Sequence, residues 1–212
     1  YYWNVNKQSA HLLDEIRQAF TEGNQEKAEM LTRQNFNSEV SYDADGENPF
    51  RFGSFTTMGE FYVETGLNII GMSDYKRILS LDSAMAVVQF KKDHVAYQRN
   101  YFISYPANVM VMRFSADQPG KQNLVFSYAP NPVSTGNMAS DGNKGLVYSA
   151  SLDNNGMKYV VRIQAETKGG TLFNADGKLT VKGADEVVFY ITADTDYKPN
   201  FDPDFKEPKT YV

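Results

Sequence analysis

Residues 99–116, "RNYFISYPANVMVMRFSA", decide the fold class. Two strand-like runs, residues 94–104 and 108–116, flank a Ser-Tyr-Pro break, and side chains along a strand alternate between its two faces. The second run is bulky or apolar at nearly every position, so both of its faces are apolar. Such a strand is covered on both sides. Pro106 has no N–H to give to a central ladder, so it belongs to the connection.

Working outward, strand-like composition continues through most of the chain after residue 54. We predict eleven strands, at residues 55–64, 75–81, 84–91, 94–104, 108–116, 122–128, 145–152, 156–168, 171–174, 178–182 and 185–193. Turn signals separate them, at Lys92-Asp93, "QPGK" (118–121), "DNNG" (153–156) and Asp176-Gly177. Residues 129–144 are predicted to be a long polar loop. No βαβ alternation occurs, so the pattern predicts a mainly β fold, a two-sheet antiparallel β-sandwich. One face of 108–116 would pack on the opposite sheet, and the helices or another domain would cover the other.

A short helical hairpin is predicted before the sandwich, at residues 9–36. Ser9 is the expected cap of the first helix, Gly23 ends it, and Asn24 caps the second helix. Helical periodicity predicts an inward-facing set of Leu12, Leu13, Ile16, Ala19 and Phe20 on the first helix, and of Ala28, Leu31 and Phe36 on the second.

The predicted organisation is a single domain from a larger protein. It comprises a helical hairpin and loop (1–53), the β-sandwich (54–193) and a linker toward a missing catalytic domain (194–212). The chain starts without Met or a signal peptide, which indicates a mature product or a cut piece, and its end suggests that more chain follows.

Composition excludes several classes of protein. The net charge of −5 gives no electrostatic case for binding nucleic acid or an anionic membrane. No run of 18 apolar residues occurs, so we predict no transmembrane helix. The chain has no Cys, which excludes disulfides and thiolate chemistry.

Residues suited to catalysis or metal binding do not form a recognisable constellation. His11 and His94 have no second histidine at metal spacing. The acidic loop 43–48 fails the spacing of a calcium loop, and the aspartates between 194 and 204 are typical of turns. Glycoside hydrolysis needs two carboxyl groups, and no pair can be assigned from the sequence. We therefore predict no catalytic residue, no metal and no cofactor in this chain.

Aromatic residues gather near the start of the chain and in its first long loop: Tyr1, Tyr2, Trp3, Tyr42, Phe50, Phe52 and Phe55. Such side chains either stack on sugar rings or bury themselves against a partner surface. Tyr2 and Trp3 are the candidate substrate-binding residues.

The segments 75–90 and 94–116 together resemble the amino-terminal domain of glycoside hydrolase family 95, the α-L-fucosidases. The matching positions are Tyr75, Arg77, Leu79, Leu81, Asp82 and Ala84, then Val95, Tyr97, Arg99, Phe102, Ser104, Tyr105, Pro106, Val109, Val111, Arg113 and Ala116. His94 replaces the usual turn glycine and Asn100 the usual acidic residue. The helical segment, residues 58–61 and the final strand also resemble this family.

The resemblance implies a non-catalytic domain of a bacterial, inverting α-L-fucosidase-like enzyme. Its partner would be a helical-barrel catalytic domain of the same polypeptide, which would carry the catalytic acid and base. Carbohydrate would bind to the intact enzyme, whose expected location is periplasmic or extracellular. Two alternatives remain open, a stand-alone carbohydrate-binding module and a domain of a related exo-glycosidase such as a galactosidase. Arg99 and Arg113 are predicted to be structural, with Asp82 a candidate partner of Arg113.

Overall fold

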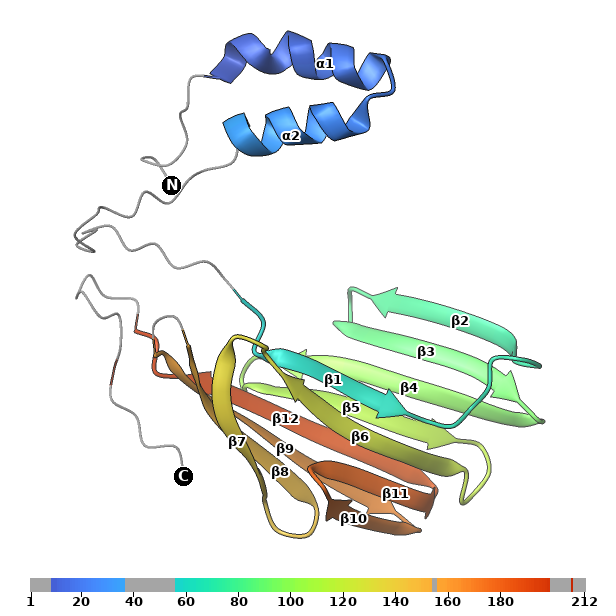
Figure 1. Ribbon diagram of the computed structural model, residues 1–212. Helices are drawn as coiled ribbons and strands as arrows, with labels where there is room; N and C mark the ends of the chain where they lie inside the picture. Colours follow the sequence, from blue (N-terminus) through green and yellow to red (C-terminus); the bar gives the residue numbers. More distant parts are fainter. Residues whose placement is uncertain (1–8, 37–55, 154–155, 199–206, 208–212) are drawn as a thin grey trace. The chain divides into compact units, whose positions relative to one another are not determined.

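The computed structural model describes residues 9–36, 56–153, 156–198 and 207 (Figure 1). The chain divides into two compact units, residues 1–53 and residues 54–212, and each is described by itself. None of the helices in the described part is long and apolar enough to cross a bilayer.

The first unit contains a helical hairpin. A 3-10 turn, η1 (Ser9–Leu12), leads into α1 (Leu13–Thr21), and α2 (Gln25–Phe36) follows after a tight turn. Gly23 adopts a φ of 75°, and the backbone N–H of Lys27 donates to Asn24 Oδ1 at 3.1 Å. The predicted helix end and the predicted cap of α2 are therefore confirmed.

Other predictions for the hairpin were wrong. The N-cap residue of α1 is Leu12, which makes no side-chain capping bond, because the 3-10 turn displaces Ser9 from the start of the α-helix. The buried core is Ile16, Ala19 and Ala28, with Leu31 packed against it. The predicted inward residues Leu13, Phe20 and Phe36 are exposed, since two short helices bury only a narrow stripe of each other.

The second unit is an antiparallel arrangement of two sheets, as predicted. Its strands are β1 (Gly59–Glu64), β2 (Ser73–Ser80), β3 (Met85–Lys92), β4 (Val95–Ser104), β5 (Val109–Ala116), β6 (Gln122–Pro130), β7 (Ser134–Ser140), β8 (Gly145–Leu152), β9 (Lys158–Lys168), β10 (Thr171–Ala175), β11 (Lys178–Ala184) and β12 (Glu186–Thr195). The smaller sheet has the order β1-β6-β11-β10, and the larger has the order β2-β3-β4-β5-β12-β9-β8-β7 (Figure 1).

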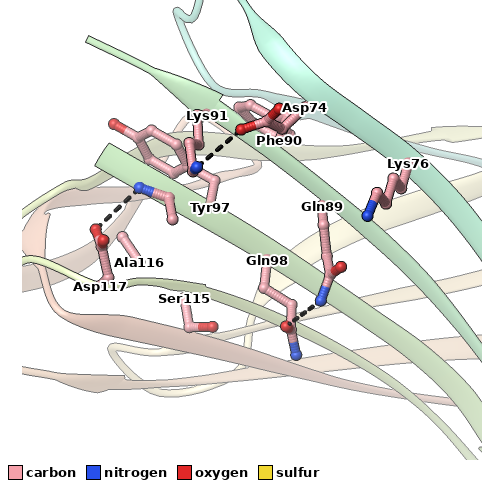
Figure 2. Close-up of a pocket in the computed structure, with 11 residues that line it drawn as sticks. Asp74, Lys76, Gln89, Phe90, Lys91, Tyr97, Gln98, Ser115, Ala116 and Asp117 are labelled. Carbon is pink, nitrogen blue, oxygen red and sulfur yellow. Dashed lines mark hydrogen bonds and ion pairs between the residues drawn. The ribbon is translucent and has the colours of Figure 1, made fainter. Parts of the chain in front are cut away.

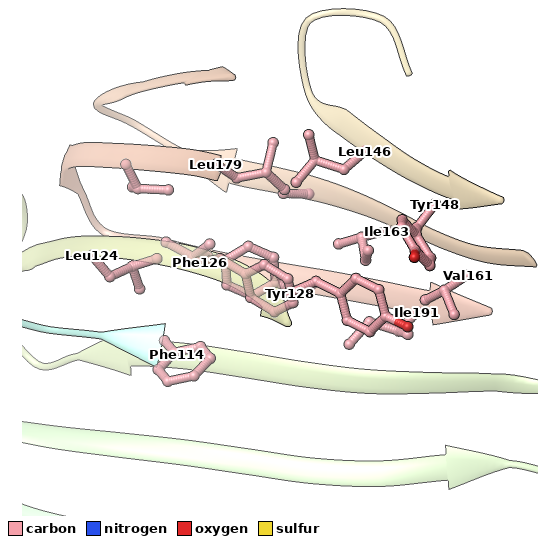
Figure 3. Packing of buried hydrophobic residues seen from close by; sticks show 14 of the residues in the cluster. Phe114, Leu124, Phe126, Tyr128, Leu146, Tyr148, Val161, Ile163, Leu179 and Ile191 are labelled. Atoms are coloured by element: carbon pink, nitrogen blue, oxygen red, sulfur yellow. The ribbon is translucent and has the colours of Figure 1, made fainter. Parts of the chain in front are cut away.

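The core lies between the two sheets. Figure 3 shows Phe114 of β5, Phe126 of β6 and their neighbours meeting across the gap. Phe126 stacks on Phe189 of β12 with ring centroids 4.5 Å apart, and Phe189 meets Phe114 edge-on at 6.0 Å. Offset-stacked and edge-to-face rings are the favoured aromatic geometries, so this trio joins one sheet to the other.

Strand β5 has the two apolar faces that its sequence predicts. Phe114 pairs with Val187 of β12, and both are buried in the core. Val111 lies on the opposite face and is also buried, at 8% exposure. Pro106 lies in the turn between β4 and β5, as its missing N–H requires.

The predicted loop 129–144 is wrong, because it contains strand β7. β7 is an edge strand that pairs only with β8, and its sequence is polar and includes a glycine. Backbone hydrogen bonds to β8 and the packing of Met138 against the core hold β7 in place. Its sequence lacks the alternating apolar residues of a typical strand. Composition alone therefore gave no strand signal.

Candidate functional site

The candidate substrate-binding residues Tyr2 and Trp3 lie outside the described residues. So do the acidic loop at 43–48, Asp202, Asp204 and the other early aromatic side chains. Of the late aspartates, Asp196 is buried and its carboxylate accepts the backbone N–H of Lys158 at 2.9 Å. Asp196 thus fastens the end of β12 to the start of β9.

The two histidines occupy exposed turns. His11 is in η1, and His94 lies in the β3–β4 turn with a φ of 62°. Across the described ranges, no three or more His, Asp or Glu side chains gather as a group that could hold a metal ion.

A hollow of about 640 Å³ lies over strands β2 to β5 (Figure 2). It is lined by Asp74, Lys76, Gln89, Phe90, Lys91, Ala96, Tyr97, Gln98, Ser115, Ala116 and Asp117. Lys76, Gln89, Gln98 and Ser115 form one row across the four strands, since each pairs with the next in the strand register. The small side chain of Ser115 at one end of that row leaves space above the sheet.

Side-chain amides form a hydrogen-bonded chain at this hollow. Gln89 Nε2 donates to Gln98 Oε1 at 2.8 Å, and Gln98 Nε2 donates to Asn100 Oδ1 at 3.0 Å. Asn100 in turn donates to the sulfur of Met85 at 3.2 Å. An amide group has two donor hydrogens and an oxygen with two lone pairs, so Gln89 and Gln98 retain capacity for a polar ligand.

The carboxylates of the hollow are already engaged. Asp74 forms an ion pair with Lys91 at 2.8 Å, and this contact holds the pKa of Asp74 below its ordinary value. Asp117 accepts the backbone N–H of Ala96 at 2.9 Å. A general acid for glycoside cleavage needs a raised pKa. Asp74 is therefore poorly suited to donate a proton, and the polar groups that the hollow offers are chiefly its amides.

Arg113 is paired with a different residue from the one predicted. Its guanidinium bonds to the carboxylate of Glu186, at the start of the neighbouring strand β12, and not to Asp82. The prediction failed because strand order was unknown: Asp82 lies in the turn between β2 and β3, whereas the neighbours of β5 are β4 and β12. The bond to Arg113 lowers the pKa of Glu186.

Arg99 is placed among aromatic rings. Its guanidinium carbon lies 5.1 Å from the ring centroid of Phe90 and 5.8 Å from that of Phe114. Cation–π contacts of this kind stabilise a partly buried arginine. Arg99 and Arg113 thus have packing and ion-pair partners within the described sheet.

A polar cluster around the carboxylate of Asp141 lies at the other end of the large sheet. Asp141 accepts from Arg162 Nε at 2.5 Å and from Gln164 Nε2 at 2.6 Å. The bond to Arg162 is the main cause of the lowered pKa of Asp141. Charge-assisted bonds of this type fix the β7–β8 turn against β9.

The sequence alone does not reveal the hollow and its amides. Gln89 and Gln98 lie in predicted strands and belong to no motif. Both alternate with buried aromatic neighbours, Phe90 and Tyr97. The predicted Lys92-Asp93 turn would have placed Gln89 opposite Ala96. The turn lies one residue later, at Asp93-His94, and this register places the two glutamines opposite each other.

Comparison with known proteins identifies the family. The family model described as "Glycosyl hydrolase family 65, N-terminal domain" matches residues 3–200. The chain belongs to this family. The match supports the coarser part of the resemblance, a glycoside hydrolase amino-terminal domain, and does not single out family 95.

One curated protein and one solved structure are similar to parts of the chain. The chain is 29% identical over 163 residues to "Probable alpha-fucosidase A" of Aspergillus niger, an alignment covering 72% of this chain and 20% of the relative. The chain thus spans a fifth of the length of that curated relative. "Putative kojibiose phosphorylase from human microbiome" aligns in structure at 12% identity and a TM-score of 0.45, over 65% of this chain and 22% of that one.

Proposed function

We propose that the chain is the non-catalytic amino-terminal domain of an α-L-fucosidase-like glycoside hydrolase of family 95, and that it supports a helical-barrel catalytic domain of the same polypeptide. The family match over residues 3–200 supports the coarser part of this proposal, a glycoside hydrolase amino-terminal domain. The fucosidase relative and the resemblance of residues 75–116 to family 95 favour the finer part. The bacterial origin and export implied by the resemblance stay predictions, and the curated relative is fungal.

Three carboxyl groups of the sandwich have a pKa unsuited to general-acid catalysis. An inverting glycosidase uses an acid and a base about 6.5–9.5 Å apart, and the acid has a raised pKa. Among the described residues, the carboxyl groups with a clearly displaced pKa are Asp74, Asp141 and Glu186, and each is lowered by a basic partner. These three groups stay ionised at neutral pH, which is the opposite of what a general acid needs.

A stand-alone carbohydrate-binding module is the second candidate, and the hollow of Figure 2 favours it. Its amide chain and Ser115 offer donors and acceptors suited to sugar hydroxyls. Affinity electrophoresis of the chain in gels with and without fucosylated polysaccharide tests this candidate. Retardation that Gln98→Ala removes would favour a binding module, while unchanged mobility would favour a supporting role.

The parent polypeptide provides the test of the main proposal. With an aryl α-L-fucoside as substrate, the full-length protein should release β-L-fucose first, seen by NMR before the anomers equilibrate. Release of α-L-fucose would contradict an inverting enzyme. Activity only on an aryl galactoside would favour the related exo-glycosidase that the sequence left open.

A further inference from the structure

The larger sheet is wider than the sheet that covers it. Its core face packs against a layer of four strands, of which β1 is an edge. Within that layer β6 lies against β5, and β11 lies against β8 and β9. Strands β2 and β3 lie at the edge of the larger sheet, beyond β4 (Figure 1).

Cross-strand rows show which side chains share the face of the core. Buried Phe114 pairs with Arg99, Arg99 with Val88, and Val88 with Arg77 of β2. The row therefore runs from the core out to an exposed arginine. Leu79 is two residues from Arg77 and lies on the same face, whereas Ile78 between them points to the opposite face.

The end of this outer core face near the β2–β3 turn is apolar and open, whereas at its other end Leu67 and Met72 pack against buried Phe90 and Val95. The large apolar side chains on it, and in the two turns at its end, are exposed: Tyr75 56%, Leu79 71%, Leu81 84%, Ile103 66% and Tyr105 94%. The two turns lie at the same end of the sheet, because Ser80 pairs with Met85 and Ala86 with Tyr101. These five residues and Arg77 are called the β2–β4 face below.

A cluster of this kind differs from scattered surface hydrophobics. Single exposed apolar residues are normal, but contiguous patches mark contact surfaces. Arg77 adds a specific feature, since among the described residues it forms no ion pair. A partner surface that is apolar and places a carboxylate opposite Arg77 would bury the apolar side chains and pair the charge of Arg77.

The small size of the β2–β4 face indicates what kind of partner covers it. A stable dimer takes about 20–30 residues from each partner, far more than this face offers. A domain on the same polypeptide needs less, because tethering gives it a high effective concentration. The fucosidase relative is about five times longer than the part matched, so most of such a protein lies outside this region.

We propose that the β2–β4 face is the surface on which the catalytic domain of the same polypeptide docks, with a carboxylate of that domain at Arg77. The inference rests on the proposed function for the existence of that domain. It adds which face of the sandwich is covered and which residues make the contact.

Cysteine labelling tests the proposal directly, because the chain has no cysteine of its own. Leu79→Cys probes the docking face, and Ile78→Cys, on the opposite face of the same strand, is the matched control. Both variants are made in the full-length polypeptide and in the 212-residue chain. Maleimide labelling at the two positions is followed by peptide mass spectrometry.

The expected result is that Leu79→Cys is labelled about tenfold or more slowly in the full-length protein than in the 212-residue chain, which corresponds to docking worth about 1.4 kcal/mol. Ile78→Cys should be labelled equally fast in both. Equal labelling of Leu79→Cys in both proteins would overturn the proposal. Slow labelling of Leu79→Cys in the isolated 212-residue chain would also overturn the proposal. If that labelling became slower as the protein concentration rose, the occupant would be a second copy of the chain.

Failure of this inference is distinguishable from failure of the proposed function. The fucoside assay on the same full-length variants reports the function separately. Protection of Leu79→Cys without fucoside hydrolysis would leave docking standing and sink the assigned activity. Hydrolysis without protection would do the reverse. Arg77→Glu should also raise the labelling rate of Leu79→Cys in the full-length protein, whereas a merely exposed Arg77 would not change it.

Discussion

Replacing Phe189 by alanine probes the contact that joins the two sheets. Phe189 is fully buried in β12, and its ring stacks on Phe126 of the opposite sheet at 4.5 Å. It also meets Phe114 of the adjacent strand at 6.0 Å. The alanine variant loses all of these contacts at once and leaves a cavity in the middle of the core.

The expected loss of stability is large compared with the stability of a typical domain. Phe→Ala substitutions in cores cost about 3–5 kcal/mol, against a total of about 5–15 kcal/mol for most domains. For a chain of this size each kcal/mol lowers the melting temperature by about 2–4 °C, so a fall of about 6–20 °C is expected.

Thermal unfolding followed by circular dichroism measures this effect. Phe173→Ala is the matched control, because Phe173 lies in β10 of the smaller sheet and is 40% exposed. The control should melt within a few degrees of the parent chain. If Phe189→Ala also melted within about 2 °C of the parent chain, the loss of stability would be under about 1 kcal/mol. Phe189 would then not be packed between the two sheets as described.

Three further outcomes follow from the same sheet. Met112→Asp should lower the melting temperature severely, because Met112 packs against the core and an unpaired carboxylate there costs several kcal/mol; a shift of a degree or two would place it at the surface. Arg113→Met should cost at most about 1 kcal/mol in urea unfolding, since the pair with Glu186 is partly exposed and solvent screens it; a loss above 3 kcal/mol would indicate a buried pair. Asp141 has a lowered pKa in the folded state, so its stabilisation is present above the unfolded-state pKa and is lost as pH falls through the folded-state pKa; Asp141→Asn should flatten the decline in stability below about pH 4, and an unchanged decline would contradict the pairing with Arg162.

Much of the fold could be predicted because the strands alternate and the turns carry strong local signals. The run 108–116 has two apolar faces, and both faces bury a residue, Phe114 on one and Val111 on the other. The Asp93-His94 and Asp176-Gly177 turns adopt positive φ at both residues, as tight hairpins require. The Asp176-Gly177 turn lies where it is predicted, whereas the predicted Lys92-Asp93 turn is one residue too early. Local chemistry therefore located both hairpins, but not the register of β3 on β4.

Features that depend on long-range pairing were not predictable. β7 is polar and held by its neighbour β8, so its own residues carry no strand pattern. The partner of Arg113 depends on β12 lying beside β5, a pairing that spans 73 residues of sequence. The exposure of Leu79 likewise follows from a sheet wider than its cover, and the residues of β2 alone do not reveal that width.

If this chain supports catalysis without performing it, the purified 212-residue chain at high concentration should not hydrolyse an aryl α-L-fucoside. We expect no release of the aryl group above the rate without protein, whatever the substrate concentration. Saturable turnover that scales with the concentration of the chain would contradict it, because a catalytic acid and base would then have to lie within these 212 residues.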